Sequence, residues 1–308
     1  MFDLSIVIVS WNTRELLREC LESLYKYTSQ LTFEVFVVDN NSSDGSPEMV
    51  RTLFPRVNVI ANDYNAGFSK ANNQAIRVSK GRYIALLNPD TVLTEDVFSP
   101  LIANADQHAK IGAIGPKIFC RDGKKIQYSC AKKLPNLYSA FCSASGLSSR
   151  SRIFYGAYMS DRDYESSRYV EALCGACMVV RKSAIEAVGL MDENQFMYGD
   201  EIDWCKRLAD SGWYIYYYAD ASIIHYGGES SKQAMQQINF QFLRARRYYF
   251  RKHHGELYAF VYSTQLGLFS LFKYIWILLF RAKNRSHREI MANHLSLVKW
   301  ALKNTVGR

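Results

Sequence analysis

Asp90 is the carboxylate whose place in the sequence most suggests chemistry. It follows the uncharged run 83–87, which reads as a strand buried on both faces and is ended by Asn88-Pro89. In open α/β sheets the carboxyl ends of strands are where ligands bind. An Asp after a strand more commonly serves as a turn residue or helix cap, so a metal-binding role needs support from elsewhere in the chain.

A second group of carboxylates opens a predicted helix over residues 196–208. Asp200, Glu201 and Asp203 fall within four positions. Acidic residues in a first turn ordinarily complement the helix dipole, which is the plain explanation. Three of them exceed what capping needs, and like charges so close raise one another's pKa. This arrangement can keep a general base poised for proton abstraction.

His225 is the third candidate. It leaves the apolar stretch 223–224 and is followed by Tyr226 and the glycine pair 227–228, so its backbone could bend toward a site. The ordinary alternative is a histidine satisfied within the core.

Polar loops follow two other predicted strands. In the loop 39–45, Asp39 could accept a hydrogen bond from a base, while Asn41 and Ser42 could donate to a ribose. An Asx turn that caps the next helix explains the same residues equally well. The segment 65–67 suits a backbone that must pass close to a ligand, with Asn72 facing in from the next helix; a simple turn is again the alternative.

Alternating apolar runs and amphipathic stretches must position these residues. The pattern predicts a parallel sheet with right-handed crossovers, and the absence of a GxGxxG motif counts against an NAD enzyme. Residues 120–170 read as irregular, and a long insert of that kind is usually functional or mobile. Residues 213–220 read as an edge strand. The expected strands are 4–9, 33–38, 57–60, 83–87 and 111–118, and the expected helices are 13–27 (capped by Thr13), 70–79 and 95–108.

Composition places the chain among globular proteins. It has 308 residues, 48% hydrophobic and 22% charged, and its N-terminus enters a strand without a signal-peptide pattern, so export is not expected. The seven cysteines are scattered and odd in number, which suits reduced thiols in a cytosol. Cys174 and Cys177 have the spacing of a redox or zinc half-site, but no second pair accompanies them.

The basic charge belongs to the last quarter of the chain. Residues 1–231 carry 24 Lys and Arg against 27 Asp and Glu, whereas residues 232–308 carry 14 against 2. Within that quarter, 257–280 is apolar and near the roughly 20 residues that span a bilayer. Lys273 and basic residues on both sides favour helices lying on an anionic membrane surface instead. Packing against the catalytic domain or a second copy, as a homodimer, is the alternative.

Several of these motifs in this order resemble glycosyltransferase family 2, most closely its rhamnosyltransferase-like and galactofuranosyltransferase-like members. The matching stretches cover roughly residues 4–231 and are 5–12, 39–45, 65–73, 88–90, 200–203 and His225. The resemblance implies an α/β GT-A fold, meaning a mixed, mostly parallel, Rossmann-like sheet flanked by helices. It implies a catalytic domain over 1–231, with a donor-binding half at about 1–92 and an acceptor half at about 93–231. A basic helical extension, 232–308, would follow.

The resemblance also implies roles for residues around a nucleotide-sugar donor. Asp90 and His225 would hold Mg²⁺ or Mn²⁺, with Asn88 standing where many members have a further Asp. Asp39 would hold the base. The other donor contacts would come from Ser10, Trp11, Asn12, Asn41, Gly67, Phe68, Asn72 and Asn88.

On the acceptor side, Glu201 falls where the family has its catalytic base, usually Asp, and Asp200 is a second candidate. Asp203, Trp204 and Arg207 would contact the acceptor, although a structural role is an equal alternative for Asp203 and Arg207.

The activity implied is inverting transfer of a sugar to a hydroxyl of a glycan or lipid-linked glycan at the cytoplasmic face of a bacterial membrane. dTDP-rhamnose is the expected donor, with UDP-GlcNAc, UDP-galactofuranose or another UDP-sugar as alternatives. A nucleotidyltransferase is more remote, because residues 10–13 are not a glycine-rich, basic loop. A nucleic-acid partner is not expected, because the aromatics of 257–280 lie among aliphatic residues rather than cations.

Overall fold

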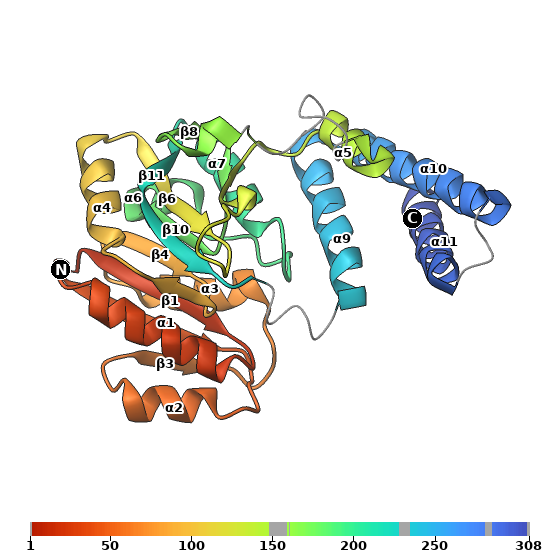
Figure 1. Ribbon diagram of the computed structural model, residues 1–308. Coiled ribbons are helices and arrows are strands. Elements are labelled where there is room, and N and C mark those ends of the chain that lie inside the picture. The colour runs from red at the N-terminus through yellow and green to blue at the C-terminus, as the bar shows by residue number, and fades with distance from the viewer. Residues whose placement is uncertain (1, 148–158, 160, 228–234, 281–284, 307–308) are drawn as a thin grey trace. The chain divides into compact units, whose positions relative to one another are not determined.

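The computed structural model describes residues 2–147, 159, 161–227, 235–280 and 285–306 (Figure 1). Over these residues the main sheet has the strand order β3-β2-β1-β4-β10-β6-β11-β5, and β8 pairs with β11. Strand β10 runs antiparallel to both β4 and β6, while β1, β2, β3 and β4 are mutually parallel and β11 is parallel to β6. The predicted α/β architecture is therefore confirmed. The strands are β1 (Leu4–Ser10), β2 (Phe33–Asp39), β3 (Asn58–Ala61), β4 (Tyr83–Leu87), β5 (Thr91–Leu93), β6 (Ile111–Phe119), β8 (Arg168–Val170), β10 (Cys177–Arg181) and β11 (Tyr214–His225), with β7 (Ala131–Lys132) and β9 (Ala172–Leu173) in a separate pair.

Burial on both faces explains the central strands. All five residues of β4 are buried, as are Leu4, Ile6 and Ile8 of β1. Each fully buried aliphatic side chain of this kind contributes about 1.5–3 kcal/mol. Helices pack on both faces of the sheet (Figure 1). They are α1 (Arg14–Tyr27), α2 (Ser46–Leu53), α3 (Phe68–Val78), α4 (Phe98–Gln107), α6 (Lys182–Val188) and α7 (Asp200–Asp210).

Helix α1 begins where the sequence predicted, but its cap is different. The hydroxyl of Thr13 lies 3.0 Å from that of Ser10 and makes no cap hydrogen bond. Asp44, from the loop after β2, instead accepts from the backbone N–H of Arg14 at 2.8 Å. Thr13 is therefore at the predicted N-cap position, where its carbonyl accepts from the N–H of Leu17 at 2.8 Å, but its side chain does not cap the helix. The Asp44 contact ties the loop after β2 to the start of α1.

Two other predictions need correction. Residues 213–220 do not form an edge strand, because β11 pairs with β6 on one side and with β5 and β8 on the other. The region 120–170 is not uniformly irregular either. It contains β7, β8, short 3₁₀ turns and α5 (Leu137–Ser145), whose Asn136 forms a capping box with Ser139.

The chain divides into two compact units. The larger unit comprises Met1–Leu134 and Tyr158–Phe242, and the helical unit comprises Pro135–Ala157 and Leu243–Arg308. The boundary predicted between residues 231 and 232 lies outside the described residues. That a segment starting at Pro135 belongs with the C-terminal helices was not foreseen.

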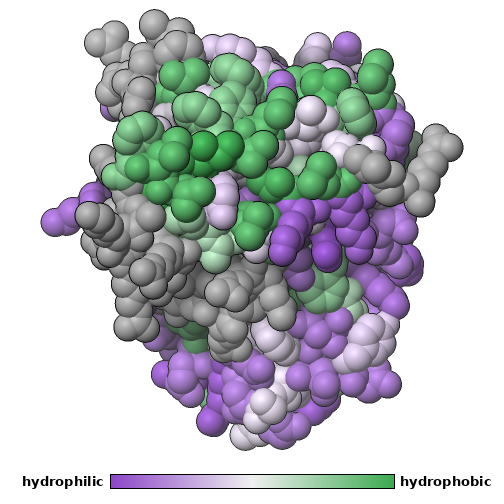
Figure 2. Space-filling view, turned by 90° about the vertical axis from the view of Figure 1, so that its right-hand side faces the viewer, coloured by the Kyte–Doolittle hydropathy of each residue, from purple (hydrophilic) through white to green (hydrophobic). Residues whose placement is uncertain are grey.

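The helical unit contains α5, most of α9 (Met235–His254), α10 (Glu256–Phe280) and α11 (Arg285–Val306). Helices α10 and α11 approach closely at Gly267, where an added Cβ would lie 2.8 Å from that of Ala301. The rings of Phe141 and Phe269 join α5 to α10 with centroids 5.1 Å apart. Much of α10 nevertheless remains exposed, and Figure 2 shows hydrophobic surface gathered on this side of the molecule.

Candidate active site

The carboxyl ends of β1, β2, β4 and β11 lie along one edge of the sheet, because these strands run in the same direction. Asp39 ends β2, Asn88 and Asp90 follow β4, and His225 ends β11. The antiparallel register pairs His225 directly with Thr91 of β5. This pairing brings His225 beside Asp90 across more than a hundred residues of sequence, as the sequence analysis anticipated.

Asp90 and His225 are in direct contact. Oδ1 of Asp90 lies 3.1 Å from Nε2 of His225, and both side chains are more than nine-tenths buried. Nδ2 of Asn88 lies 3.2 Å from the same Nε2, so Asn88 occupies this corner as well. We call Asn88, Asp90 and His225 the strand-end corner.

Gln127 fixes the orientation of the histidine and was missed from the sequence. Its Oε1 lies 2.8 Å from Nδ1 of His225, and its Nε2 donates to the hydroxyl of Ser129 at 3.0 Å. With Oε1 accepting from Nδ1–H, the lone pair of Nε2 faces the Asp90 carboxylate. In this tautomer a cation can lie between Nε2 and the carboxylate, and Nδ2 of Asn88 is placed to donate to the same Nε2.

The strand-end corner therefore fits a divalent cation held by two protein ligands, with phosphate oxygens as further ligands. An imidazole whose second nitrogen is hydrogen-bonded is the usual form of a metal-ligating histidine. Among the described residues, no group of three or more His, Cys, Asp or Glu side chains could hold a metal ion by itself. Cys174 and Cys177 are free thiols whose pKa values are raised by burial.

Among the residues predicted to contact the nucleotide-sugar donor, Asp39 is the one whose carboxylate has an unpaired oxygen. Its Oδ2 accepts from the backbone N–H of Ser42 at 2.8 Å, in the manner of an Asx turn. Its Oδ1 is buried and has no hydrogen-bond partner in the described part of the chain. A buried acceptor without a partner costs about 1–3 kcal/mol. The N–H of a nucleotide base would satisfy that oxygen.

The loops after β1 and β2 are bonded to each other beside Asp39. The backbone N–H of Asn12 donates to the hydroxyl of Ser42, and Oδ1 of Asn12 accepts from the N–H of Ser43, each at 2.8 Å. Asn12 and Asn41 have φ values of 51° and 63°, a left-handed conformation that asparagine tolerates. Trp11 is partly exposed next to them, and Ser10 is buried.

The turn at Gly67 has a structural reason for its glycine. Gly67 has φ of 78°, and an added Cβ would lie 2.5 Å from the carbonyl oxygen of Phe196. That carbonyl also accepts from the N–H of Phe68 at 2.8 Å. The predicted contact of Gly67 and Phe68 with the nucleotide-sugar donor stays a prediction. The Asn72 amide likewise turns back to the Phe68 carbonyl of its own helix, at 2.9 Å.

Helix α7 begins with two carboxyl groups of opposite character. Glu201 accepts from Nζ of Lys132 at 3.0 Å. Although burial opposes it, this ammonium and a hydrogen bond from Asp200 lower the pKa of Glu201. For Asp200, burial and then the Glu201 charge raise the pKa well above its ordinary value. Of the two, Glu201 therefore ionises more readily and Asp200 holds its proton more tightly, and the Ser69 hydroxyl lies 3.3 Å from Oδ2 of Asp200.

Glu201 lies on the same side of Gly175 as Phe68. A Cβ added at Gly175 would lie 3.4 Å from the Phe68 ring and 3.9 Å from Cβ of Glu201. The backbone next to it also meets the strand-end corner, because the carbonyl of Ala176 accepts from the N–H of Asn88 at 2.9 Å. We call Asp200, Glu201 and Lys132 the helix corner.

The predicted acceptor contacts on α7 have structural partners. Nε of Arg207 donates to the fully buried Asp203 at 2.8 Å, and its other nitrogens donate to the carbonyls of Val188 and Leu190. The structural alternative is therefore favoured for Asp203 and Arg207. The prediction for Trp204 was wrong, because its ring is fully buried and its Nε1 donates to the carbonyl of Gly189.

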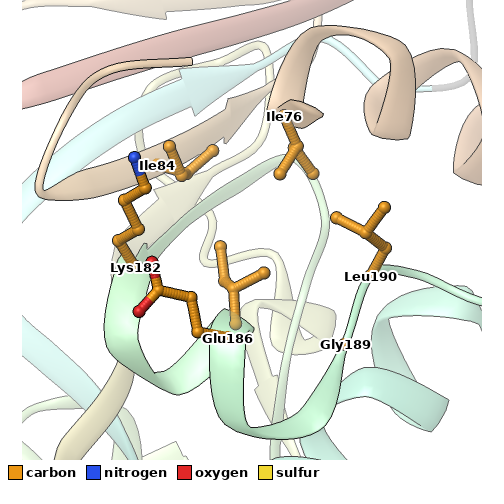
Figure 3. Close-up of a pocket in the computed structure, with 7 residues that line it drawn as sticks. Ile76, Ile84, Lys182, Glu186, Gly189 and Leu190 are labelled. Carbon is orange, nitrogen blue, oxygen red and sulfur yellow. The ribbon is translucent and has the colours of Figure 1, made fainter. Parts of the chain in front are cut away.

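A pocket of about 280 Å³ lies elsewhere, between α3 and α6 (Figure 3). The side chains of Ile76, Ile84 and Leu190 face it, together with Lys182 and Glu186. It contains none of the residues of the two corners, and we assign it no role.

Comparison with known proteins identifies the family of the chain. The model of the family described as "Glycosyl transferase family 2" matches residues 5–189, well over half of the chain. The chain belongs to glycosyl transferase family 2.

Relatives of this family member include an N-acetylglucosaminyl-diphospho-decaprenol L-rhamnosyltransferase of Mycobacterium tuberculosis. The two are 29% identical over 240 residues, which cover 74% of this chain and 77% of that protein. A low-salt glycan biosynthesis hexosyltransferase, Agl10, of Haloferax volcanii is 27% identical over 209 residues, or 67% of this chain and 61% of that one.

Two solved structures share the GT-A fold. The mannosyltransferase PcManGT from Pyrobaculum calidifontis, in complex with GDP-Man and Mn²⁺, has a TM-score of 0.59 at 16% identity, covering 98% of this chain and 87% of its own. GalNAc-T7 with UDP, GalNAc and Mn²⁺ has a TM-score of 0.61 at 14% identity, covering 98% and 56%. At these identities the likeness is one of fold.

Proposed function

We propose that this glycosyltransferase moves a sugar from a nucleotide-diphosphate donor to an acceptor hydroxyl, with inversion at the anomeric carbon. The observation that carries the proposal is the buried Asp90–His225 contact at 3.1 Å, at the sheet edge where Asp39 keeps an unpaired oxygen. The unpaired carboxylate oxygen of Asp39 suits the N–H of a nucleotide base. The Asp90–His225 pair suits a cation bound to the diphosphate at the other end of the same molecule.

In this proposal the loops after β1 and β2 hold the nucleoside, and Asp39 accepts from the base. Asp90 and His225 hold a divalent cation, which when bound neutralises the charge of the diphosphate leaving group. A histidine ligand suits Mn²⁺ better than Mg²⁺, and the two solved relatives contain Mn²⁺.

Glu201 is the general base of the proposal. It takes the proton from the acceptor hydroxyl as that oxygen forms a bond to the anomeric carbon. The bond from that carbon to the phosphate oxygen breaks, and the nucleoside diphosphate departs. General-base assistance of this kind contributes about 10²–10⁴-fold. Asp200 is a poorer candidate for the same task, because burial and then the Glu201 charge raise its pKa, so it holds its proton more tightly.

We infer that the donor is dTDP-rhamnose and the acceptor a lipid-linked glycan, on the strength of the mycobacterial relative's activity. UDP-GlcNAc and UDP-galactofuranose are the alternative donors. A thermal-shift panel of UDP-, dTDP- and GDP-sugars with Mn²⁺ tests this choice. Stabilisation by dTDP-rhamnose alone supports it, and stabilisation by a UDP-sugar alone replaces it. The anomeric configuration of the product, read by NMR, tests inversion.

We further propose that the helical unit binds an anionic lipid surface on the cytoplasmic side of a membrane. Helix α10 is long and apolar enough to cross a bilayer, judged by length and composition alone. Its apolar 18-residue stretch has a mean hydropathy of 1.3, and only 17% of that stretch is buried. Its exposed side chains include Leu268, Phe272, Leu279 and Phe280. The same length and composition also fit a helix packed against protein. The choice between a lipid surface and a protein partner therefore rests on charge.

Charge favours a lipid surface over a second copy of the chain. Residues 232–308 carry 14 Lys and Arg against 2 Asp and Glu. Arg251 and Lys252 at the end of α9, and Lys299 and Lys303 on α11, are exposed. Each basic residue near an anionic surface adds about 1 kcal/mol, whereas two such units would repel each other.

Vesicle sedimentation with the full chain tests this assignment. We expect binding to vesicles containing phosphatidylglycerol and little binding to pure phosphatidylcholine. The double variant Leu268→Asp/Phe272→Asp should lose binding, while Leu53→Asp, at an apolar position of α2 that is 54% exposed, should retain it. Absence of binding by the unaltered chain would contradict the proposal, and a dimer in sedimentation velocity would then assign the face to a second copy.

A further inference from the structure

Lys132 makes the closest charged contact with Glu201. Its Nζ lies 3.0 Å from Oε1 of Glu201, and the two side chains are 15% and 14% exposed. An ion pair so well shielded from water is not the weak surface type, and losing either partner leaves a buried charge without compensation.

A fixed element delivers this ammonium. Lys132 belongs to β7, and its backbone pairs with Ala172 of β9, so its approach does not depend on a long loop. Strand β9 in turn leads to Cys174 and Gly175, and Gly175 lies beside Glu201. The ammonium and the carboxylate therefore come from separate elements that meet at the start of α7.

Three other titratable groups lie near Glu201 in the described part of the chain, and they are an acid and two thiols. Asp200, on the same helix, hydrogen-bonds to Glu201, and burial and then the Glu201 charge raise its pKa. Burial raises the pKa of the Cys174 thiol and raises that of Cys205 to about 12, so both are neutral at physiological pH. Lys132 is therefore the group that supplies positive charge to Glu201 in this set.

We propose that Lys132 is a positioning residue for sugar transfer, which holds Glu201 ionised and oriented toward the place where the acceptor hydroxyl must arrive. The inference rests on the proposed function of Glu201 as base. The ammonium holds Oε1 of Glu201 at 3.0 Å, so the orientation of the base is set before the acceptor binds. Without Lys132, burial raises the pKa of Glu201 without a counter-ion to oppose it, and a larger share of the base carries a proton at neutral pH.

The pH dependence of kcat/KM separates this role from a purely structural one. Lys132→Met should lower turnover at neutral pH by roughly 10²-fold, the cost of a misplaced catalytic group. The acidic limb of its profile should move to higher pH, with activity recovering under alkaline conditions, and the KM for the donor should hardly change. Lys132→Arg should restore most of the activity. Lys133→Met, which removes the neighbouring exposed lysine, is the control for net charge.

A measurement without turnover separates failure of this inference from failure of the proposed function. Glutamate labelled with ¹³C at the side-chain carboxyl reports the titration of Glu201, identified by the signal missing in Glu201→Gln. We expect Lys132→Met to move that titration to higher pH and Lys133→Met to leave it in place. An unmoved titration, or a loss of activity uniform over all pH values, overturns the role of Lys132. Absence of transfer by the unaltered enzyme with any donor would instead overturn the proposed function.

Discussion

The strand-end corner and the helix corner handle buried carboxylates in opposite ways. Asp90 lies 3.1 Å from Nε2 of a histidine that Gln127 orients, and the Asn88 amide lies beside the same nitrogen, an arrangement that suits a cation. Glu201 has its counter-ion in Lys132, and burial raises the pKa of Asp200. In our proposal the strand-end corner therefore binds a positive ligand, whereas the charge of the helix corner is compensated from within.

This difference teaches how the two substrates are handled. A corner that needs a cation suits the donor, because the donor brings a diphosphate that a metal ion can bridge to the protein. A corner whose charge is internally balanced suits a neutral acceptor hydroxyl, which needs a base but no counter-ion.

The largest effect should come from the proposed general base, Glu201. Glu201→Gln should lower kcat by about 10²–10⁴-fold while leaving donor affinity unchanged, because it removes proton abstraction and not donor contacts. Steady-state kinetics and donor titration of the same preparation measure both quantities. Asp200→Asn should cost much less, since Asp200 holds its proton more tightly. Normal turnover by Glu201→Gln together with an inactive Asp200→Asn would move the base by one residue.

The next largest effect concerns the unpaired oxygen of Asp39. Asp39→Asn keeps one carbonyl oxygen for the Ser42 N–H. It loses the second acceptor oxygen, which we assign to the nucleotide base. A hydrogen bond to a charged group contributes about 1.5–3 kcal/mol, so nucleoside diphosphate affinity should fall by roughly 10–100-fold. Isothermal titration with the best-binding nucleotide measures this. Unchanged affinity would show that the oxygen does not face the nucleotide.

A comparable or smaller effect should follow loss of the group that orients His225. Gln127→Leu removes the acceptor 2.8 Å from Nδ1. Changes of this kind cost about 10–100-fold in metal affinity or activity. Activity titrated against Mn²⁺ should show a higher half-saturating concentration with a similar plateau. Gln127→Glu, which keeps an acceptor at that place, serves as the control, and equal titrations for Gln127→Leu and the unaltered enzyme would reject the role.

The smallest catalytic effect should come from the far face of α7. Arg207→Met removes the guanidinium that pairs with the buried Asp203 and donates to the carbonyls of Val188 and Leu190, which should destabilise the fold by about 3–5 kcal/mol. A large fall in the urea midpoint with little change in KM for either substrate is expected. A selective rise in the acceptor KM at normal stability would restore the acceptor role of Arg207.

The sequence predicted the position of a site residue where the helix or strand next to that residue could itself be recognised. Asp39 and Asp90 could be placed because apolar runs mark the strands they follow, and parallel strands share an edge. The pairing of Asp90 with His225 came from the family resemblance. The antiparallel contact of β5 with β11 that produces it leaves no periodic trace.

Residues from segments without periodicity could not be placed. Lys132 and Gln127 lie in a stretch that read as irregular, and their partners are set by tertiary contacts with β9 and β11. Gly67 was recognised as a tight turn, but the need for a positive φ does not reveal what approaches it. The prediction that Trp204 contacts the acceptor was wrong for a related reason, because the sequence does not show which face of α7 is buried.

The most direct test of the central claim is calorimetric titration of the nucleoside diphosphate with and without Mn²⁺. In the unaltered enzyme Mn²⁺ should strengthen nucleotide binding, and it should not do so in Asp90→Asn or His225→Ala. Asp122→Asn, at an exposed loop carboxylate, should behave like the unaltered enzyme. If Mn²⁺ strengthens nucleotide binding equally in all four proteins, the strand-end corner does not hold the cation and the account is wrong.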